Sequence, residues 1–299
     1  MERTTVKIPA TSANMGPGFD CLGMALDIWN TVTIEPGGHG IEITGEGADV
    51  LPKGPSNLII KCFRAVFERL DRPVPQVKII CHNEIPVSRG LGSSSAGIVG
   101  GLMAANSMCG DPISQHQLLE LAVEIEGHPD NVAPAMLGGC QIGVQDDGRL
   151  ITSQVPLPRE LKAVLFVPDV PISTDQARNI LPSTVDRADA VYNIGRVALL
   201  VRALITGDLQ HLNVATQDRL HQPARQELFF PMKNILRGAM DAGALGVFLS
   251  GAGSSVLALT TDKEFTIGYE MADAASKSGI GGEIKVTRPS AKGAYVEPH

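Results

Sequence analysis

The sequence lacks several features that would assign it to a common class. Its 299 residues contain no C-x-x-C pair, which argues against a zinc ribbon or a thioredoxin-like site. No run approaches the roughly 18 apolar residues of a membrane helix, and the N-terminal segment has no apolar stretch of signal-peptide length. The net charge is −7 without a long Lys/Arg run, so a general nucleic-acid or anionic-membrane binder is not expected. Five widely spaced cysteines are typical of reduced thiols. We therefore expect a cytoplasmic protein without nucleic-acid or membrane partners.

Three familiar motifs are absent as well. The Walker A loop, G-x-x-x-x-G-K-[ST], has no match. Gly90-Leu91-Gly92 begins like the dinucleotide-binding G-x-G-x-x-G, but its sixth position is Ser95. The segment ending at Ala96 lacks the last Gly of a G-x-S-x-G nucleophile elbow. A Walker-type nucleotidase, a dinucleotide-binding site and a serine hydrolase are therefore not indicated.

The composition, 43% hydrophobic and 19% charged, is that of a folded globular chain. The β-branched segment Asp27–Glu35 and the segment Ile41–Gly47 predict a hairpin across a Gly-rich turn. Early hairpins favour an α+β fold over a doubly wound parallel sheet. No linker marks a sharp boundary, and we place it near residue 155, which gives domains 1–155 and 156–299.

A helix over Ser114–Glu126 shows the clearest amphipathic pattern. Ser114 is a suitable N-cap residue. The apolar stripe at i, i+3, i+4 and i+7 consists of Leu118, Leu121, Ala122 and Ile125. Glu120 lies roughly opposite this stripe, so periodicity alone makes it a solvated surface residue.

The segment Ile85–Gly97 has the composition of an anion-binding loop. Three Gly and four Ser lie between a predicted strand and a predicted helix of small residues. Glycines let the backbone approach a ligand closely. The free N–H groups and positive dipole end of the helix's first turn suit a phosphate group. We therefore predict a phosphate site here.

Three segments in order resemble the motifs of the GHMP kinases, a family of small-molecule kinases that includes enzymes acting on galactose, homoserine and mevalonate. Pro86–Ala96 matches the family's phosphate loop in full, and Leu249–Leu259 resembles its C-terminal Gly-rich motif. Pro9–Leu26 is similar to the N-terminal motif in the form found in the branch that acts on homoserine. Glu126–Gly139 and Ser173–Pro182 are close to the same branch.

The resemblance implies a fold, a cofactor and a partner. We expect the α+β GHMP kinase fold, with a ribosomal-protein-like N-terminal half, a ferredoxin-like C-terminal half and assembly as a homodimer. ATP is the implied phosphoryl donor. The implied ATP-binding residues are Pro86, Val87, Ser88, Arg89, Gly90, Leu91, Gly92, Ser93, Ser94, Ser95 and Ala96.

Phosphoryl transfer also requires Mg²⁺, which favours oxygen ligands. Ser94 and a carboxylate of the following helix would hold the ion, and Glu120, Glu124 and Glu126 are available. The resemblance favours Glu120, in the Glu-Leu-Ala stretch.

The implied acceptor is an amino acid, L-homoserine, phosphorylated in threonine biosynthesis. Its carboxylate would be bound by Arg178 and Arg225, because the guanidinium fork matches a carboxylate. Asn14 and Asp20 would orient the hydroxyl, and Asp130 would hold the ammonium or act as a base. The implied acceptor site is completed by His128, Asn131 and Thr174.

Other functions remain open at this point. A kinase for another small alcohol, such as mevalonate, would need no group for an ammonium. A decarboxylase of the same fold would also use ATP. A non-catalytic nucleotide sensor would be free to lose the metal ligands, and both Ser94 and Glu120 are present.

Overall fold

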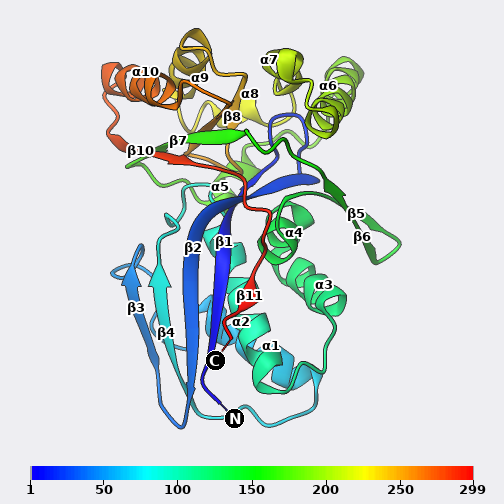
Figure 1. Ribbon diagram of the computed structural model, residues 1–299, viewed down its shortest axis with the longest axis vertical. Coiled ribbons are helices and arrows are strands. Elements are labelled where there is room, and N and C mark those ends of the chain that lie inside the picture. Colours follow the sequence, from blue (N-terminus) through cyan, green and yellow to red (C-terminus); the bar gives the residue numbers. More distant parts are fainter. Residues whose placement is uncertain (1, 299) are drawn as a thin grey trace.

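The computed structural model describes residues 2–298, which form two sheets covered by helices (Figure 1). The central strands of the first sheet follow the order β11-β1-β2-β4-β3, and β5 pairs with the start of β2 and with β6. All pairs in this sheet are antiparallel except β3 with β4. Its strands are β1 (Thr4–Ala13), β2 (Leu22–Pro36), β3 (Ile41–Gly45), β4 (Val77–Asn83), β5 (Cys140–Asp146), β6 (Arg149–Val155) and β11 (Tyr295–Val296).

The predicted hairpin between β2 and β3 is wrong. β4 lies between these two strands, antiparallel to β2 and parallel to β3. The short strand β3 buries only Ile41 and Ile43 and exposes the residues between and after them, as suits the edge of a sheet. The sequence between β2 and β3 gave no sign that a later strand would be inserted there.

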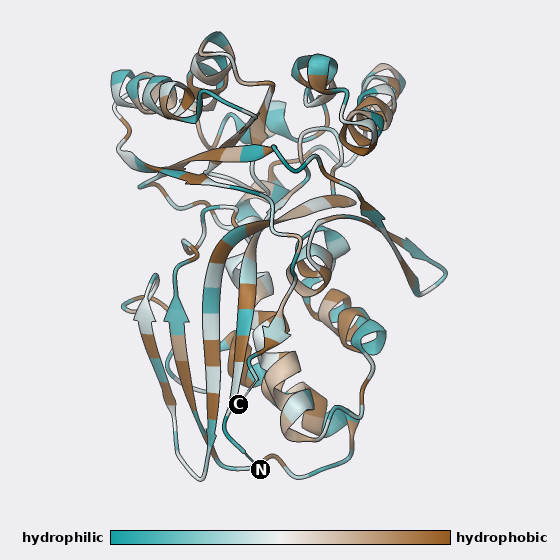
Figure 2. Ribbon diagram, viewed as in Figure 1, coloured by the Kyte–Doolittle hydropathy of each residue, from teal (hydrophilic) through white to brown (hydrophobic). Residues whose placement is uncertain are grey.

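Four helices cover one face of the first sheet: α1 (Leu58–Arg69), α2 (Ser93–Met108), α3 (Gln115–Glu126) and α4 (Pro129–Leu137). α2 packs against β1 and against all three other helices of this layer. Its small residues allow this close packing, because Gly101 lies directly against α1. The hydropathy colours of the first sheet alternate along the strands, as expected for strands with one buried face (Figure 2).

α3 begins as predicted but buries a different stripe. Ser114 caps it through a reciprocal capping box with Gln117. Its buried residues are Leu118, Leu119, Ala122 and Val123. Ile125 is 38% exposed, so the predicted stripe was rotated by part of a turn.

The second sheet has the strand order β10-β7-β9-β8, and every adjacent pair is antiparallel. Its strands are β7 (Lys162–Pro168), β8 (Gly246–Leu249), β9 (Val256–Thr260) and β10 (Gly282–Thr287). Numbered within this half, the order is 4-1-3-2, that of a ferredoxin-like sheet. The accompanying helices are α5 (Thr174–Asn179), α6 (Arg187–Thr206), η1 (Leu209–His211), α7 (Leu212–Ala215), α8 (Gln222–Arg225), α9 (Met232–Asp241) and α10 (Glu264–Lys277). The predicted α+β class is confirmed.

The end of the chain returns to the first sheet. β11 pairs with β1, and the N–H of Ala294 donates to the carbonyl oxygen of Ala135 in α4. The proposed domain boundary near residue 155 stays a prediction. Within residues 2–298, no helix combines the length and the hydropathy needed to cross a bilayer.

Two helical glycines provide a matched test of the packing between α1 and α2. A Cβ on Gly101 would lie 2.6 Å from the carbonyl oxygen of Ile59, whereas a Cβ on Gly195 in α6 meets no atom within 4 Å. Gly101→Ala should lower the free energy of unfolding by about 1–3 kcal/mol through overpacking. Gly195→Ala should raise it by about 0.5–1 kcal/mol, because alanine favours a helix. Urea unfolding measures both, and a stabilising Gly101→Ala would contradict the close contact.

Candidate active site

The loop between β4 and α2 presents an uncapped helix N-terminus. Gly92 is the N-cap, with φ 73°, and no side chain caps the helix. The N–H of Ala96 is bonded to Gly92, so the donors ahead of it in the first turn are left for a ligand. This is the anion site that the Gly/Ser composition predicted.

Two glycines of this loop are fixed by close contacts. A Cβ on Gly90 would lie 2.1 Å from the carbonyl oxygen of Ser250, and one on Gly92 would lie 1.9 Å from Oγ1 of Thr11. Both residues have positive φ. Any larger residue would therefore displace the phosphate loop from its neighbours.

The C-terminal Gly-rich segment joins this loop to the end of β1. Ser250 Oγ donates to the carbonyl oxygen of Gly90 at 2.7 Å and lies 2.8 Å from Ser12 Oγ. The N–H of Gly251 donates to the Ala13 carbonyl at 3.1 Å. The three motifs recognised in the sequence therefore meet in space.

One cavity of about 290 Å³ lies where they meet. Its lining includes Gly251, Ala252 and Gly253 of the C-terminal segment and eight of the eleven predicted ATP-binding residues. All eight predicted acceptor-site residues line it too: Asn14, Asp20, His128, Asp130, Asn131, Thr174, Arg178 and Arg225. The structure thus brings nearly every predicted site residue to one place.

The three remaining loop residues, Pro86, Arg89 and Ser95, do not line the cavity. Arg89 instead ties the loop to the end of β7, since Nε donates to the Pro168 carbonyl at 2.6 Å and Nη2 to the Asp169 carbonyl at 2.8 Å. Ser95 is buried behind the loop. Their places suggest a supporting role in holding the loop.

The carboxylate beside the phosphate loop is Glu126. Its Oε1 accepts hydrogen bonds from the hydroxyls of Ser94 and Ser95, both at 2.8 Å. Glu120 lies two turns earlier on α3, does not line the cavity and faces His116 at 3.6 Å. Glu120, which the resemblance favoured as the metal carboxylate, therefore lies outside the cavity, and the carboxylate beside Ser94 is that of Glu126. The two carboxylates lie on different faces of α3. Glu126 continues the buried row that contains Leu119 and Val123, and Glu120 does not.

Elsewhere in the cavity lining, Arg178 binds Asp20. Its two terminal nitrogens donate to the two carboxylate oxygens at 3.1 and 2.8 Å. This hydrogen-bonded pair raises the pKa of Arg178 above its usual value. Asn14 is anchored beside the pair, since Nδ2 donates to the Gly251 carbonyl and Oδ1 accepts from the Asp20 N–H, both at 3.0 Å. Asn14 and Asp20 both have positive φ, which Asn and Asp tolerate better than most residues.

Arg225 is the buried cation of the site, with 3% of its surface exposed. Its Nη1 donates to the Gly251 carbonyl at 2.9 Å and its Nε to the Ala177 carbonyl at 3.2 Å. Burial, together with the nearby charge of Arg178, lowers the pKa of Arg225 to about 10. The guanidinium still carries its charge at neutral pH.

Asp130 is a second buried carboxylate, with 2% exposed. It lies at the N-terminus of α4 and is hydrogen-bonded to Nδ1 of His128. Burial opposes the protonation of His128, but the hydrogen bond and the charge of Asp130 outweigh it, so the pKa of His128 is raised. Oxygen and nitrogen atoms of Asp20, His128 and Asp130 lie within 4.8 Å of one another. Asn131 is fixed by a 2.7 Å bond from Thr11 Oγ1.

Part of the lining was not predicted from the sequence. An apolar and amide-rich region adjoins the phosphate loop, formed by Asn30, Val32, Leu51, Pro52, Ser56, Asn57, Leu58, Ile59 and Asn83. These residues come from β2, β4, the segment between β3 and α1, and the start of α1. They form no motif along the chain, so only the fold reveals them.

The family comparisons agree with this geometry. The GHMP kinase N-terminal domain family matches residues 57–139, and the GHMP kinase C-terminal family matches residues 200–275. The homoserine kinase of Moorella thermoacetica is 43% identical over 97% of this chain and 99% of its own. The chain belongs to the homoserine kinase family of GHMP kinases. Similarly, the homoserine kinase of Crocosphaera subtropica is 40% identical over 100% of this chain and 99% of its own.

Solved structures lead to the same family. The crystal structure of homoserine kinase from Cytophaga hutchinsonii superposes with a TM-score of 0.89 at 32% identity and covers 99% of this chain and 98% of that one. The L. major mevalonate kinase shares the fold alone, at 17% identity and a TM-score of 0.72 over 96% of both chains. The predictions of the family, its fold and an ATP-dependent kinase are confirmed.

Proposed function

We propose that this protein transfers the γ-phosphoryl group of ATP to the hydroxyl of L-homoserine. The hydroxyl oxygen bonds to the γ-phosphorus as the bond to ADP breaks and the hydroxyl proton is released, which yields O-phospho-L-homoserine for threonine biosynthesis. One observation carries the proposal: a single cavity is lined both by an anion-binding helix terminus and by two Arg with two carboxylates. The relatives named as homoserine kinases support the same acceptor.

The nucleotide lies with its phosphates against the N-terminus of α2. The exposed N–H groups of the first turn and the helix dipole stabilise the phosphate oxygens. The adenine ring occupies the adjoining region around Leu51, Pro52 and Ile59, where apolar side chains and the amide of Asn57 are available. The residues of the cavity thereby accommodate both halves of ATP.

Mg²⁺ would be held by Ser94 and Glu126. The fit rests on their chemistry, since a carboxylate oxygen and a hydroxyl converge at 2.8 Å beside the phosphate loop, and Mg²⁺ prefers such oxygen ligands. When bound, the ion neutralises charge on the phosphate oxygens. Ser95 holds Oε1 of Glu126 from the buried side and so fixes the direction of the carboxylate.

The acceptor lies beside the two Arg. Arg225 and Arg178 bind its carboxylate. The carboxylates of Asp20 and Asp130, which lie close together, bind its ammonium. The side-chain amide of Asn14 bonds to the Gly251 carbonyl and the Asp20 N–H, which leaves one Nδ2 hydrogen and one Oδ1 lone pair free. Asn14 orients the acceptor's hydroxyl with these. Asp20 assists with the lone pairs that Arg178 does not use. Thr174, Asn131 and His128 complete the wall.

Two other functions are less consistent with this cavity. Mevalonate has a carboxylate but no ammonium, and the buried carboxylate of Asp130 would then have no cationic ligand to bind. A non-catalytic sensor needs no metal pair, yet Ser94 and Glu126 are hydrogen-bonded beside the phosphate loop. The homodimer and the cytoplasmic location stay predictions.

An acceptor screen tests the proposed function. The purified protein should consume ATP with L-homoserine and only slowly with mevalonate, galactose or shikimate. The expected preference for L-homoserine over mevalonate is at least about 100-fold in kcat/KM, because the buried carboxylate of Asp130 loses its cationic partner with mevalonate. ADP release measures each rate. Equal or better use of mevalonate would refute the assignment.

The metal site is tested by a pair of substitutions on α3. Glu126→Gln should lower kcat by about 100-fold or more, because the ion contributes several kcal/mol to the transition state. Glu120→Gln is the matched control and should stay within about 2-fold of the wild type, as expected for a residue outside the site. Steady-state kinetics at saturating Mg²⁺ and thermal melting measure activity and folding. A large loss confined to Glu120→Gln would restore the original assignment.

The proposed site for the acceptor's carboxylate is tested at Arg178. Its side chain is 36% exposed, so a substitution by alanine leaves no buried cavity that would destabilise the fold. Arg178→Ala should lower kcat/KM for L-homoserine by about 30-fold or more, the equivalent of about 2 kcal/mol for a lost charge partner. The KM for ATP should be nearly unchanged. Arg202→Ala removes a surface Arg that is paired with Asp208 outside the cavity and serves as the control. A loss of ATP binding instead would place Arg178 at the nucleotide.

A further inference from the structure

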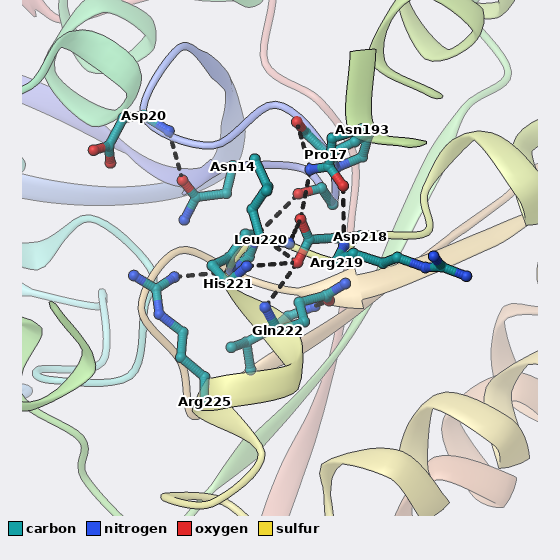
Figure 3. Close-up of polar contacts among 12 residues, drawn as sticks. Asn14, Pro17, Asp20, Asn193, Asp218, Arg219, Leu220, His221, Gln222 and Arg225 are labelled. Atoms are coloured by element: carbon teal, nitrogen blue, oxygen red, sulfur yellow. Dashed lines mark hydrogen bonds and ion pairs between the residues drawn. The ribbon is translucent and has the colours of Figure 1, made fainter. Parts of the chain in front are cut away.

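A buried polar cluster around Asp218 and His221 adjoins Arg225 (Figure 3). The side chains of Asp218 and His221 are both 0% exposed. Asp218 accepts hydrogen bonds from the N–H groups of Leu220, His221 and Gln222 at 3.0, 3.0 and 2.7 Å. It also accepts one from Nδ2 of Asn193 at 2.7 Å. The carboxylate thus holds the first turn of α8, the helix that carries Arg225.

The hydrogen bonds of His221 fix its protonation state. Nε2 lies 2.8 Å from the carbonyl oxygen of Gly16, which can only accept, so Nε2 carries the proton. Nδ1 lies 3.1 Å from Nη1 of Arg225, which can only donate, so Nδ1 has a free lone pair. His221 is therefore neutral in this arrangement. Burial lowers its pKa, which agrees with the neutral form.

His221 takes part in orienting the guanidinium of Arg225. The two hydrogens of Nη1 go to Nδ1 of His221 and the carbonyl of Gly251, and the Nε hydrogen goes to Ala177. Nη2 has no hydrogen-bond partner among residues 2–298. Because Arg225 lines the cavity, Nη2 is the end that remains for a ligand.

We propose that His221 is a positioning residue for acceptor recognition: its neutral Nε2–H form, set by the Gly16 carbonyl, directs Nη2 of Arg225 at the acceptor's carboxylate. The inference rests on the proposed function, in which Arg225 binds that carboxylate. His221 also connects the proposed sites for the acceptor's carboxylate and hydroxyl. It bonds to Arg225 on one side and to Gly16 on the other, and Gly16 lies in the loop between Asn14 and Asp20. The ring of Phe19 in that loop stacks on His221 at 5.3 Å and lies 5.5 Å from the guanidinium carbon of Arg225.

Two substitutions of His221 each remove one of its two side-chain hydrogen bonds and keep the other. Glutamine places its amide near the former Nε2, so His221→Gln can keep the bond to Gly16 but loses the acceptor for Arg225. Asparagine places its Oδ1 near the former Nδ1, so His221→Asn keeps the acceptor for Arg225 and loses Gly16. His211→Gln changes an exposed histidine outside the cavity and is the control.

The readout is the preference for L-homoserine over its methyl ester, which lacks the carboxylate charge. Each variant's kcat/KM is measured with both acceptors, together with the KM for ATP. His221→Gln should raise the KM for L-homoserine by about 10-fold or more, as expected for a lost hydrogen bond to a charged group. Its use of the ester should match the wild type. His221→Asn and His211→Gln should retain the wild-type preference.

The outcomes separate this inference from the proposed function. A wild type that does not distinguish L-homoserine from the ester would overturn the carboxylate role of Arg225 itself. A wild type that distinguishes them, with a His221→Gln variant that distinguishes them equally, would overturn only the positioning role. Should His221→Gln fail to fold, His221→Ala takes its place, since it also removes the acceptor for Arg225: a reduced preference beside a retained one in His221→Asn supports the role, and an unchanged preference overturns it.

Discussion

The peptide of Gly251 is the contact on which the acceptor end of this site depends. Its N–H donates to Ala13 at the end of β1, and its carbonyl oxygen accepts from both Asn14 and Arg225. Three segments that lie far apart in the sequence are thereby held around one backbone group. A backbone acceptor has no rotamers of its own, so Asn14 and Arg225 are placed relative to each other by the fold of the Gly-rich loop rather than by mobile side chains.

The part of the cavity beside the phosphate loop differs from the acceptor site in having no cationic side chain among residues 2–298. Within the described chain, the residues that line the cavity include no Lys, and its two Arg lie at the acceptor end. A Walker A loop places a lysine beside the phosphates, whereas this loop offers backbone N–H groups and a helix terminus. Backbone dipoles carry only partial charges. The proposed metal at Ser94 and Glu126 is therefore the full positive charge that this end lacks.

The sequence predicted the parts of the site that lie within continuous motifs and missed those that depend on packing between elements. The uncapped N-terminus of α2 was foreseen because three Gly and four Ser mark it locally. Glu126 was one of three candidate carboxylates. The family resemblance favoured Glu120 instead, although the apolar pattern alone had marked Glu120 as a surface residue. The same pattern gave no sign that Glu126 faces the phosphate loop, because it left the rotation of α3 uncertain by part of a turn. The stripe through Leu121 and Ile125 would have turned Glu126 away from Ser94, whereas the observed stripe through Leu119 and Val123 turns it inward. The insertion of β4 between β2 and β3 is likewise a tertiary event without a local signal.

The two arginines of the acceptor end differ in what a ligand must displace. Arg178 is already neutralised by Asp20, so a bound carboxylate shares or exchanges an existing partner there. Arg225 makes its bonds to two carbonyls and a neutral imidazole, none of which cancels its charge. A buried cation held by neutral acceptors keeps part of its desolvation cost until an anion arrives. Binding of a carboxylate at Nη2 relieves that cost, and an acceptor without a carboxylate leaves it in place. If Arg225 binds the acceptor as proposed, the selectivity for an acidic acceptor depends on the neutrality of the groups bonded to Arg225, His221 among them, as well as on its charge.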